Sequence, residues 1–550
     1  MNPRGASRFL ALPDIGLATI ILLHVALIWW PARFPTQDGP AHLHNADALL
    51  RISDPESPAF GEYYEVNATP SPNWLGHATL AFLLTMFSPV VAEKVFLSTY
   101  VIAFALAVRF ALGSTRTSAA SLALLSTPFI LSWHLQMGFY NFCLGVVVWC
   151  VAFGYWLRRG GLRTWRQIGL FMVFCLLLYA SHLIALGALG LVIGAVTLWT
   201  TVSDRIRHRG RPANGAAETS PPGSLRARLL APLVAALPAI ALFAIYQRNG
   251  ESHGVGWVST AKLTRELMTM DPLVALNENE RPFGIAYAAC LALLFALALI
   301  VRRRDSDSVP SAGLFAAAAS LFALYFAAPS GVGGCWYVNG RILVFAVLAL
   351  IIAIGSAPLR PWIARTAAVS GFAFGIAFLL ARQPTILAAG ELLAESLTAA
   401  PLVAPNSTIL SLGFSHRGRS ADGSPLSTRI KPFLHTGAAI AAERGAIDVR
   451  NYEANTSVFP VRYRFERNPF RAFGSDPDME AEPPRVDFIN YAKRTGASVD
   501  YILVSGFGPE HEHNLAAKGI LKQLSYGYER IFVSPGTGFV QLYKAAARQR

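Results

Sequence analysis

Residues 15–47 read IGLATIILLHVALIWWPARFPTQDGPAHLHNAD. The first half lies in a candidate membrane span, 14–33, and lacks the small-residue pattern at which a signal peptide is cleaved. The second half carries Asp38, His42, His44, Asn45 and Asp47. Ionisable groups beside a bilayer are costly unless they serve a site. The stretch therefore predicts a retained membrane span followed directly by the segment in which to look for chemistry.

The composition of the whole chain is typical of a membrane protein. Of its 550 residues, 53% are hydrophobic and 15% are charged, whereas soluble domains average about 25% charged. Apolar runs close to the roughly 20 residues that cross a bilayer recur along the chain. We expect spans at 14–33, 92–113, 118–133, 138–157, 166–180, 182–201, 229–246, 283–301, 311–328, 341–357 and 363–382. The fold class is then an all-α polytopic membrane domain of about 11 transmembrane helices.

Arginine-rich loops indicate the cytoplasmic side. Residues 158–166, 203–228 and 302–304 are arginine-rich, whereas loop 34–73 is acidic and should lie outside. An odd number of crossings must separate that loop from 158–166, so we expect the short stretch 74–88 not to cross fully. Twelve spans with one misplaced arginine block remain the alternative. The N-terminus should be cytoplasmic, in a multi-pass protein of a bacterial inner membrane.

The chain divides into two expected domains. Residues 1–382 form the membrane domain, with outer loops 34–73 and 247–282, and residues 383–550 form a soluble α/β domain outside the membrane. Within the second domain, strands are predicted at 407–412 and 499–504, a helix at 487–493, and a hairpin from 528–533 and 538–543. Loop 203–228 is expected to be cytoplasmic and disordered. The net charge of +14 reflects topology and contact with anionic membrane lipids, not nucleic-acid binding.

No metal or other cofactor is expected. The five cysteines form no Cys-x-x-Cys pair, which removes the usual zinc and redox signals. His42 and His44 cannot share a helix face, although Asp38 with His42 and His44 with Asp47 can. Two side chains do not make a site, so a divalent metal is open but not favoured.

Polar side chains collect at the expected outer ends of the spans. We predict that they line an outward-facing cavity roofed by the C-terminal domain. The candidates are Asp38, His42, His44, Asp47, His77, His134, Tyr140, Asn141, His182, Arg248, Arg281, Tyr337 and Arg341. Simpler interpretations stay open: an interfacial belt for Trp133 and Trp336, snorkelling for Arg341, a turn hydrogen bond for His182, and a helix cap for Asp38.

The layout resembles the GT-C type glycosyltransferases, membrane enzymes that use polyprenyl-phosphate sugars, such as the protein O-mannosyltransferases and the lipid A aminoarabinose transferases. The resemblance rests on Gln37-Asp38-Gly39-Pro40 with Asn45-Ala46, on Pro72-Asn73-Trp74-Leu75, and on an outer C-terminal domain. Many relatives have two adjacent acids, where this chain has Gly39 after Asp38. Many also have an acid in the next outer turn, where this chain has His134 and Gln136.

The resemblance implies sugar transfer from a polyprenyl-phosphate donor to a glycan, lipid or protein acceptor, with inversion. Asp38 is the expected base, with His42 and Asp47 as further catalytic candidates, because a positioned carboxylate can take the acceptor proton. Arg248, Arg281 and Arg341 could hold the leaving phosphate through paired hydrogen bonds. The remaining polar candidates would bind substrate. A transporter or flippase for a lipid-linked substrate and a non-catalytic assembly protein are the competing hypotheses; convergence of Asp38, His134, His182 and Arg341 in one cavity would favour the enzyme.

Overall fold

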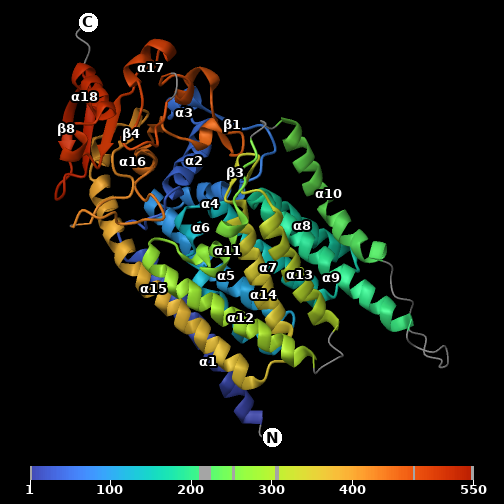
Figure 1. The fold of residues 1–550 in the computed structure, drawn as a ribbon. Helices are drawn as coiled ribbons and strands as arrows, with labels where there is room; N and C mark the ends of the chain where they lie inside the picture. The colour runs from blue at the N-terminus through green and yellow to red at the C-terminus, as the bar shows by residue number, and fades with distance from the viewer. Residues whose placement is uncertain are drawn as a thin grey trace.

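The computed structural model describes residues 3–209, 225–249, 254–303, 309–420, 422–474 and 477–546. Helices form a long bundle, and a smaller domain with a β-sheet covers one end of it (Figure 1). Helix α1 begins at the opposite end of the bundle from that domain (Figure 1). Most of the predicted disordered loop, residues 210–224, lies outside the described residues.

In these ranges, eight helices are long and apolar enough to cross a membrane. They are α1 (Pro3–Trp29), α5 (Pro89–Gly113), α7 (Tyr140–Arg159), α9 (Leu183–Arg209), α10 (Leu225–Asn249), α12 (Arg281–Arg303), α14 (Val338–Ser356) and α15 (Pro361–Leu397). Two shorter apolar helices, α8 (Trp165–Ser181) and α13 (Val309–Ala327), pack beside them. A multi-pass membrane part is therefore present, while the number of crossings stays a prediction.

Segment 118–133 differs from the α-helical span expected there. It forms a 3₁₀ helix, η1 (Thr117–Phe129), packed between α5 and α15. The Ala119 amide donates to the Arg116 carbonyl and the Ile130 amide to the Thr127 carbonyl, at 3.0 and 3.1 Å, which is the spacing of a 3₁₀ turn. At about 2.0 Å per residue, its 13 residues reach nearly as far as a longer α-helix. Hydropathy detects the buried apolar run but not the type of helix.

The stretch 74–88 folds as α4 (Leu75–Leu84), which packs against α2 and α5. Its 10 residues rise about 15 Å, roughly half of the hydrocarbon thickness. The helix is thus too short to cross a membrane alone, in keeping with the parity argument. Helix α15, in contrast, runs for 37 residues and continues past residue 382 into the C-terminal part, so the proposed domain limit lies within a helix.

The C-terminal part contains a five-stranded sheet in the order β5-β4-β7-β9-β8. Its strands are β4 (Thr408–Gly413), β5 (Ile447–Asp448), β7 (Tyr501–Ser505), β8 (Tyr528–Val533) and β9 (Val540–Ala545). Strand β4 pairs in parallel with β5 and β7, whereas β9 is antiparallel to both β7 and β8. Helices α16 (Thr436–Arg444), α17 (Phe488–Thr495) and α18 (Leu515–Gly527) accompany the sheet. The predicted strands, the α17 helix and the final hairpin are all present; α16 and β5 were not predicted.

The first outer loop is built into the C-terminal domain. It contains α2 (Gly39–Arg51), α3 (Pro58–Tyr63) and β1 (Tyr64–Val66), and β1 pairs antiparallel with β6 (Val461–Tyr463). Residues 39–48 of α2 are all buried, and α2 packs against both α4 and α16. Helix α2 is therefore the layer between the membrane helices and the roof.

Other predicted outer loops gather at the same end. They include α6 (Trp133–Gln136), α11 (Thr260–Met268) and the hairpin β2 (Gly331–Val332) with β3 (Cys335–Trp336). The C-terminal domain reaches this region through the Thr428 amide, which donates to the Leu276 carbonyl at 3.1 Å, and through the Arg429–Asp271 ion pair at 2.7 Å.

Candidate active site

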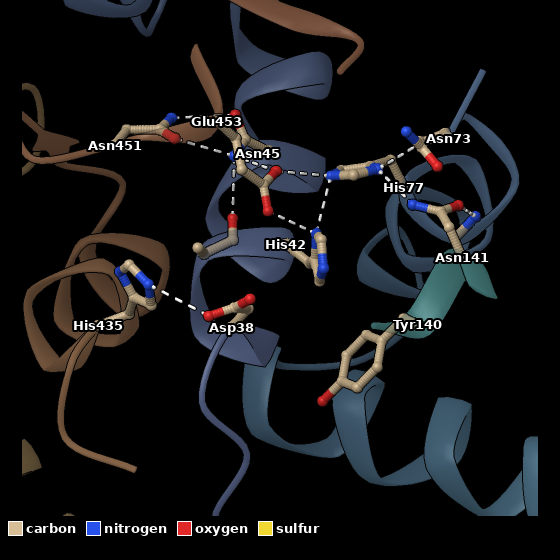
Figure 2. A network of polar contacts seen from close by, with 12 residues as sticks. Asp38, His42, Asn45, Asn73, His77, Tyr140, Asn141, His435, Asn451 and Glu453 are labelled. Atoms are coloured by element: carbon tan, nitrogen blue, oxygen red, sulfur yellow. Dashed lines mark hydrogen bonds and ion pairs between the residues drawn. The ribbon is translucent and has the colours of Figure 1, made fainter. Parts of the chain in front are cut away.

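Asp38 occupies the N-cap position of α2 but its side chain does not cap the helix. Its carboxylate instead accepts a hydrogen bond from the Gln37 amide at 3.1 Å and lies 3.5 Å from the His435 ring (Figure 2). The Tyr452 side chain also lies beside it. The proposed capping role is therefore not what the structure shows: at only 7% exposure, this carboxylate is directed toward the C-terminal domain.

The backbone around Asp38 is fixed by the turn between α6 and α7. The Gln37 amide donates to the Gln136 carbonyl at 2.9 Å, and the Asp38 amide donates to the Met137 carbonyl at 3.1 Å. From the other side, the Gln37 side chain accepts the Lys431 amide at 2.9 Å. The carboxylate is thus held between the membrane bundle and the roof by contacts to both.

A compact polar cluster lies one helical turn further along α2. His42 Nδ1 lies 2.6 Å from Glu453 Oε1, and His77 Nε2 lies 2.9 Å from Glu453 Oε2. The two imidazole nitrogens are 3.2 Å apart (Figure 2). Asn45 donates to Glu453 at 2.8 Å and exchanges hydrogen bonds with Asn451. We call His42, His77 and Glu453 the junction cluster, because they come from α2, from α4 and from the C-terminal domain.

Burial and charge act against each other in this region. Burial alone would raise the pKa of Glu453, but the His42 and His77 rings hold it well below its usual value. Burial would lower the pKa of His42, and the Glu453 carboxylate outweighs this effect and raises it. Burial, and then the Asp38 carboxylate, raise the pKa of Tyr452 far above its usual value. The Tyr452 hydroxyl beside Asp38 is therefore neutral.

Two candidates on α2 have structural partners. Asp47 accepts two hydrogen bonds from Arg51 Nε, both at 2.8 Å, and burial raises its pKa to about 6 despite that arginine. His44 lies 3.2 Å from the Tyr64 hydroxyl and accepts the Asp448 amide at 3.4 Å. Neither side chain joins the Asp38 group, because both lie on the part of α2 that packs under the sheet.

Tyr140 and Asn141 flank the site from the start of α7. The Tyr140 hydroxyl donates to Glu93 at 2.8 Å, and Glu93 in turn pairs with Arg33 at 3.1 Å. Asn141 accepts the Gly76 amide at 2.6 Å and lies 3.4 Å from His77. These contacts tie α7 to α4 and α5, so both residues support the geometry of the site from below.

His134, His182 and Arg341 form a second group around aromatic rings. The Arg341 guanidinium lies 4.4 Å from the centre of the Phe139 ring and 5.7 Å from that of Phe142. His134 and His182 lie 4.8 and 5.5 Å from the Phe142 ring. These three residues converge as expected, but the Asp38 carboxylate contacts Gln37 and His435 instead, so the four do not share one cluster.

Each member of this group has its own anchoring. Arg341 donates to the Trp336 carbonyl at 2.5 Å, which fixes the β2–β3 hairpin. The His182 ring accepts the Ile184 amide at 3.2 Å, a turn contact to an amide and not to the carbonyl considered above. The His134 nitrogens have no hydrogen-bond partner among the described residues, and burial followed by the Arg341 charge lowers the pKa of His134.

A cavity of about 510 Å³ lies beside the second group. Its wall combines the outer ends of helices with one C-terminal loop: Trp133, His134, Val258, Lys262, Leu263, Glu266, Asp271, Pro272, Glu278, Ser330, Trp336, Tyr337, Asn339, Gly340, Leu343, Thr428 and Arg429. The cavity lies near Asp38 along the chain, since α6 and the segment 428–431 line it and also hydrogen-bond Gln37, the residue before Asp38. Of the expected substrate contacts, His134 and Tyr337 line it.

The two other predicted arginines lie apart from Asp38. Arg281 pairs with Glu278, which lines the cavity. Arg248 is exposed in the last turn of α10, and no contact joins it to the site among the described residues. The predicted phosphate-binding set is therefore spread over three places.

Sequence reasoning missed every contribution of the C-terminal domain to this site. His435, Tyr452 and Glu453 reach Asp38 and the junction cluster, while Arg429 lines the cavity. The only local signal was the density of polar side chains in Asn451-Tyr452-Glu453. Nothing in their spacing relates them to α2.

Comparison with known proteins gives weak likenesses. No family model and no curated protein match. The chain is similar to ArnT from Cupriavidus metallidurans bound to undecaprenyl phosphate, with 11% identity over 97% of this chain and 98% of that one, and a TM-score of 0.47. It is also similar to the arabinofuranosyltransferase AftD from Mycobacteria, with 13% identity over 98% of this chain but 40% of that one, and a TM-score of 0.48. Both scores lie below 0.5, so these likenesses by themselves establish neither fold nor activity.

Proposed function

We propose that this chain is a GT-C type membrane glycosyltransferase that moves a sugar from a polyprenyl-phosphate donor to an acceptor on the side of the C-terminal domain. The proposal combines the motif resemblance of loop 34–73 with the site described above. Asp38 is the proposed base, and the transfer inverts the anomeric carbon. The sugar and the acceptor are not specified by these residues.

One observation carries the proposal. Asp38 stands where the resembled group has its acidic motif, and its carboxylate is buried without capping α2 or pairing with an arginine. A buried carboxylate without a strong cationic partner is costly, which favours a functional role. Its partners Gln37, His435 and Tyr452 orient it and leave it able to accept a proton.

The proposed reaction balances without a cofactor. The acceptor oxygen, or nitrogen, attacks the anomeric carbon while the bond from that carbon to the phosphate oxygen breaks. Asp38 takes the acceptor proton, and the polyprenyl phosphate leaves with the bonding electron pair. One displacement on the face opposite to the leaving group inverts the configuration. A general base of this kind contributes about 10²–10⁴-fold to the rate.

Cations that could hold the leaving phosphate line the cavity. Lys262 and Arg429 are on its wall, where Arg429 also pairs with Asp271, whereas Arg341 does not line the cavity and contacts Phe139 and the Trp336 carbonyl. We therefore propose Lys262 and Arg429 as phosphate contacts, and Arg341 as the residue that holds the hairpin carrying Trp336 in place. An arginine fork suits phosphate oxygens especially well.

The distribution of polar groups favours this proposal over transport. A secondary transporter places its ionisable groups near the middle of the bilayer. Here Asp38, the junction cluster and the cavity all lie at the helix ends beneath the C-terminal domain. His24, inside α1, contacts the Ile20 carbonyl of its own helix at 2.8 Å, so it needs no transport role.

The test is transfer of radiolabelled sugar from membrane lipid, comparing wild type, Asp38→Asn and Asp47→Asn. Asp38→Asn keeps the size and the hydrogen bonds of the side chain but removes the base, so the transfer rate should fall by about 10²–10⁴-fold. Asp47→Asn loses a pair with Arg51 remote from the reaction, so it should lower stability more than rate. Protein levels in the membrane control for folding.

Two results would contradict this assignment. Retained transfer in Asp38→Asn with loss in Asp47→Asn would move the base to Asp47. Unchanged lipid-sugar pools with altered movement of the lipid across the membrane would replace the enzyme with a transporter.

A further inference from the structure

The junction cluster brings together three atoms that can each donate a lone pair. His42 Nδ1, His77 Nε2 and the Glu453 carboxylate lie within 4.8 Å of one another. The three side chains are 5%, 0% and 0% exposed. The sequence singled out His42 and His77 as separate candidates; the fold brings them together and adds the carboxylate of Glu453.

The hydrogen bond on the far side of the His77 ring directs its lone pair inward. His77 Nδ1 lies 3.0 Å from the Asn73 carbonyl, which can only accept, so Nδ1 carries the proton. His77 Nε2 then presents its lone pair to Glu453. The His42 ring lies beside the Gly138 backbone. Ligating histidines nearly always donate their second N–H in this way to a carbonyl or carboxylate, which orients the ring toward the metal.

Two imidazole nitrogens and a carboxylate that face one another need a positive charge between them, either a proton or a metal ion. The separation of the imidazole nitrogens, 3.2 Å, is close to the roughly 3.3 Å between two nitrogens at 2.0–2.1 Å from a tetrahedral ion. Two imidazoles and one carboxylate are a donor set that zinc accepts, whereas magnesium prefers oxygen ligands. Asn45 holds the carboxylate from behind at 2.8 Å.

We propose that His42, His77 and Glu453 bind a zinc-class divalent metal ion that fastens the C-terminal domain to α2 and α4. The ligands come from segments up to 411 residues apart, since 453 − 42 = 411. The ion would therefore act as a clamp between the roof and the membrane part. His42 follows Asp38 by one turn on the same helix face, so the clamp also fixes the loop that carries Asp38. This proposal does not depend on glycosyl transfer.

Metal content is the direct test. The full chain is purified in detergent on an affinity tag without histidines, and its zinc is measured by mass spectrometry. Wild type should hold about one zinc per chain, and chelation should lower its thermal midpoint until zinc, but not magnesium, is added back. His77→Ala and Glu453→Gln should lose the zinc.

Glu453→His distinguishes a bound metal ion from a cluster that is held together by protons. This variant offers three imidazole ligands, so zinc should stay bound, although the carboxylate that pairs with a protonated imidazole is gone. Asn45→Ala keeps all three ligands but removes the support of the carboxylate, together with the Asn451 hydrogen bonds, and should weaken zinc binding about 10–100-fold. If His77→Ala does not accumulate, the chelation and reloading of wild type and the Asn45→Ala titration still decide the matter.

The proposal is overturned if wild type carries no more zinc than Glu453→Gln and if neither chelator nor added zinc changes the thermal midpoint of wild type. The cluster would then be held by protons alone. Equal zinc in wild type, His77→Ala and Glu453→Gln would overturn it as well, since the metal would lie elsewhere.

Discussion

At the scale of single residues, the missing side chain at position 39 shapes the site as much as Asp38 does. A Cβ on Gly39 would run into the Thr36 hydroxyl, the Tyr140 hydroxyl and the Glu93 carboxylate. These groups are hydrogen-bonded to one another and cannot all move aside. The second acid that many GT-C proteins have here would not fit. The departure from the resembled motif therefore has a steric reason.

Gly39→Ala should destabilise the protein, because overpacking of a tight site costs about 1–3 kcal/mol. Gly169→Ala in α8 is the matched control, since its added Cβ meets no atom within 4 Å and alanine favours a helix. Thermal unfolding in detergent measures both. An equal or higher midpoint in Gly39→Ala than in Gly169→Ala would mean that the Thr36–Tyr140–Glu93 group yields easily.

His416 should make the C-terminal domain sensitive to acid. Burial, and then the Arg450 and Lys431 charges, lower its pKa to about 2, whereas in the unfolded chain it would titrate near 6.5. Below pH 6.5 the unfolded state thus binds one more proton, and stability falls as the pH falls. The loss is at most about 1.4 kcal/mol per pH unit.

The comparison of wild type with His416→Gln isolates this effect, because the variant has no proton to bind. Between pH 7 and pH 5, the thermal midpoint of wild type should drop more steeply than that of the variant. Parallel curves would show that His416 is not responsible for the acid sensitivity.

At the scale of elements, local patterns predicted the C-terminal strands well and the membrane helices only in outline. Short apolar runs marked β4 and β7, in which every residue is buried, and the turn residues Pro535-Gly-Thr-Gly538 marked the β8–β9 hairpin. The apolar run of η1 could not reveal a 3₁₀ helix, because hydropathy does not depend on which carbonyl each amide contacts. Helix α16 was missed because seven of its nine residues are buried, which leaves no amphipathic period.

The pairing of β1 with β6 is the element contact that most needs a test, because it joins the first outer loop to the roof. Glu65 and Arg462 are directly opposite in this antiparallel pair. Opposite Cα atoms lie about 4.5–5.5 Å apart, within the range of a disulfide. Glu65→Cys with Arg462→Cys should therefore cross-link on oxidation, as read by peptide mapping without reductant.

Val66→Cys with Arg462→Cys is the control, since Val66 points to the opposite face of the strand. It should stay reduced. Cross-linking of the control but not of the test pair would mean that the register is shifted by one residue.

At the scale of the whole molecule, the site is a meeting point of segments that the sequence keeps far apart. Asp38 and His42 could be picked out because they follow a membrane span within ten residues. Glu453, His435 and Arg429 could not, because pairing across about 400 residues leaves no periodic trace. The order of spans and loops was enough to predict that the C-terminal domain covers the polar cavity. Which residues of that domain reach the site could be learned only from the three-dimensional structure.

The side of the membrane on which the C-terminal domain lies is also a property of the whole molecule. Helix α15 begins after Arg360 and reaches the C-terminal domain at its other end, where Glu395 accepts the Ser534 hydroxyl at 2.6 Å. Arg158 and Arg159 similarly occupy the last turn of α7, which begins at Tyr140 beside the site. Arginines at helix ends remain mostly in the cytoplasm. The C-terminal domain, at the opposite end of both helices, should therefore lie outside.

Reporter fusions decide this. Alkaline phosphatase fused after residue 550 should be active and a cytoplasmic fluorescent reporter at the same place dark, because phosphatase folds only outside the reducing cytoplasm. The matched control is a fusion within residues 160–164, which should give the reverse pattern. A bright cytoplasmic reporter at residue 550 would mean that the topology is inverted. Asp38 and the cavity would then face the cytoplasm, and the site would not open to the side on which the lipid-linked donor is expected.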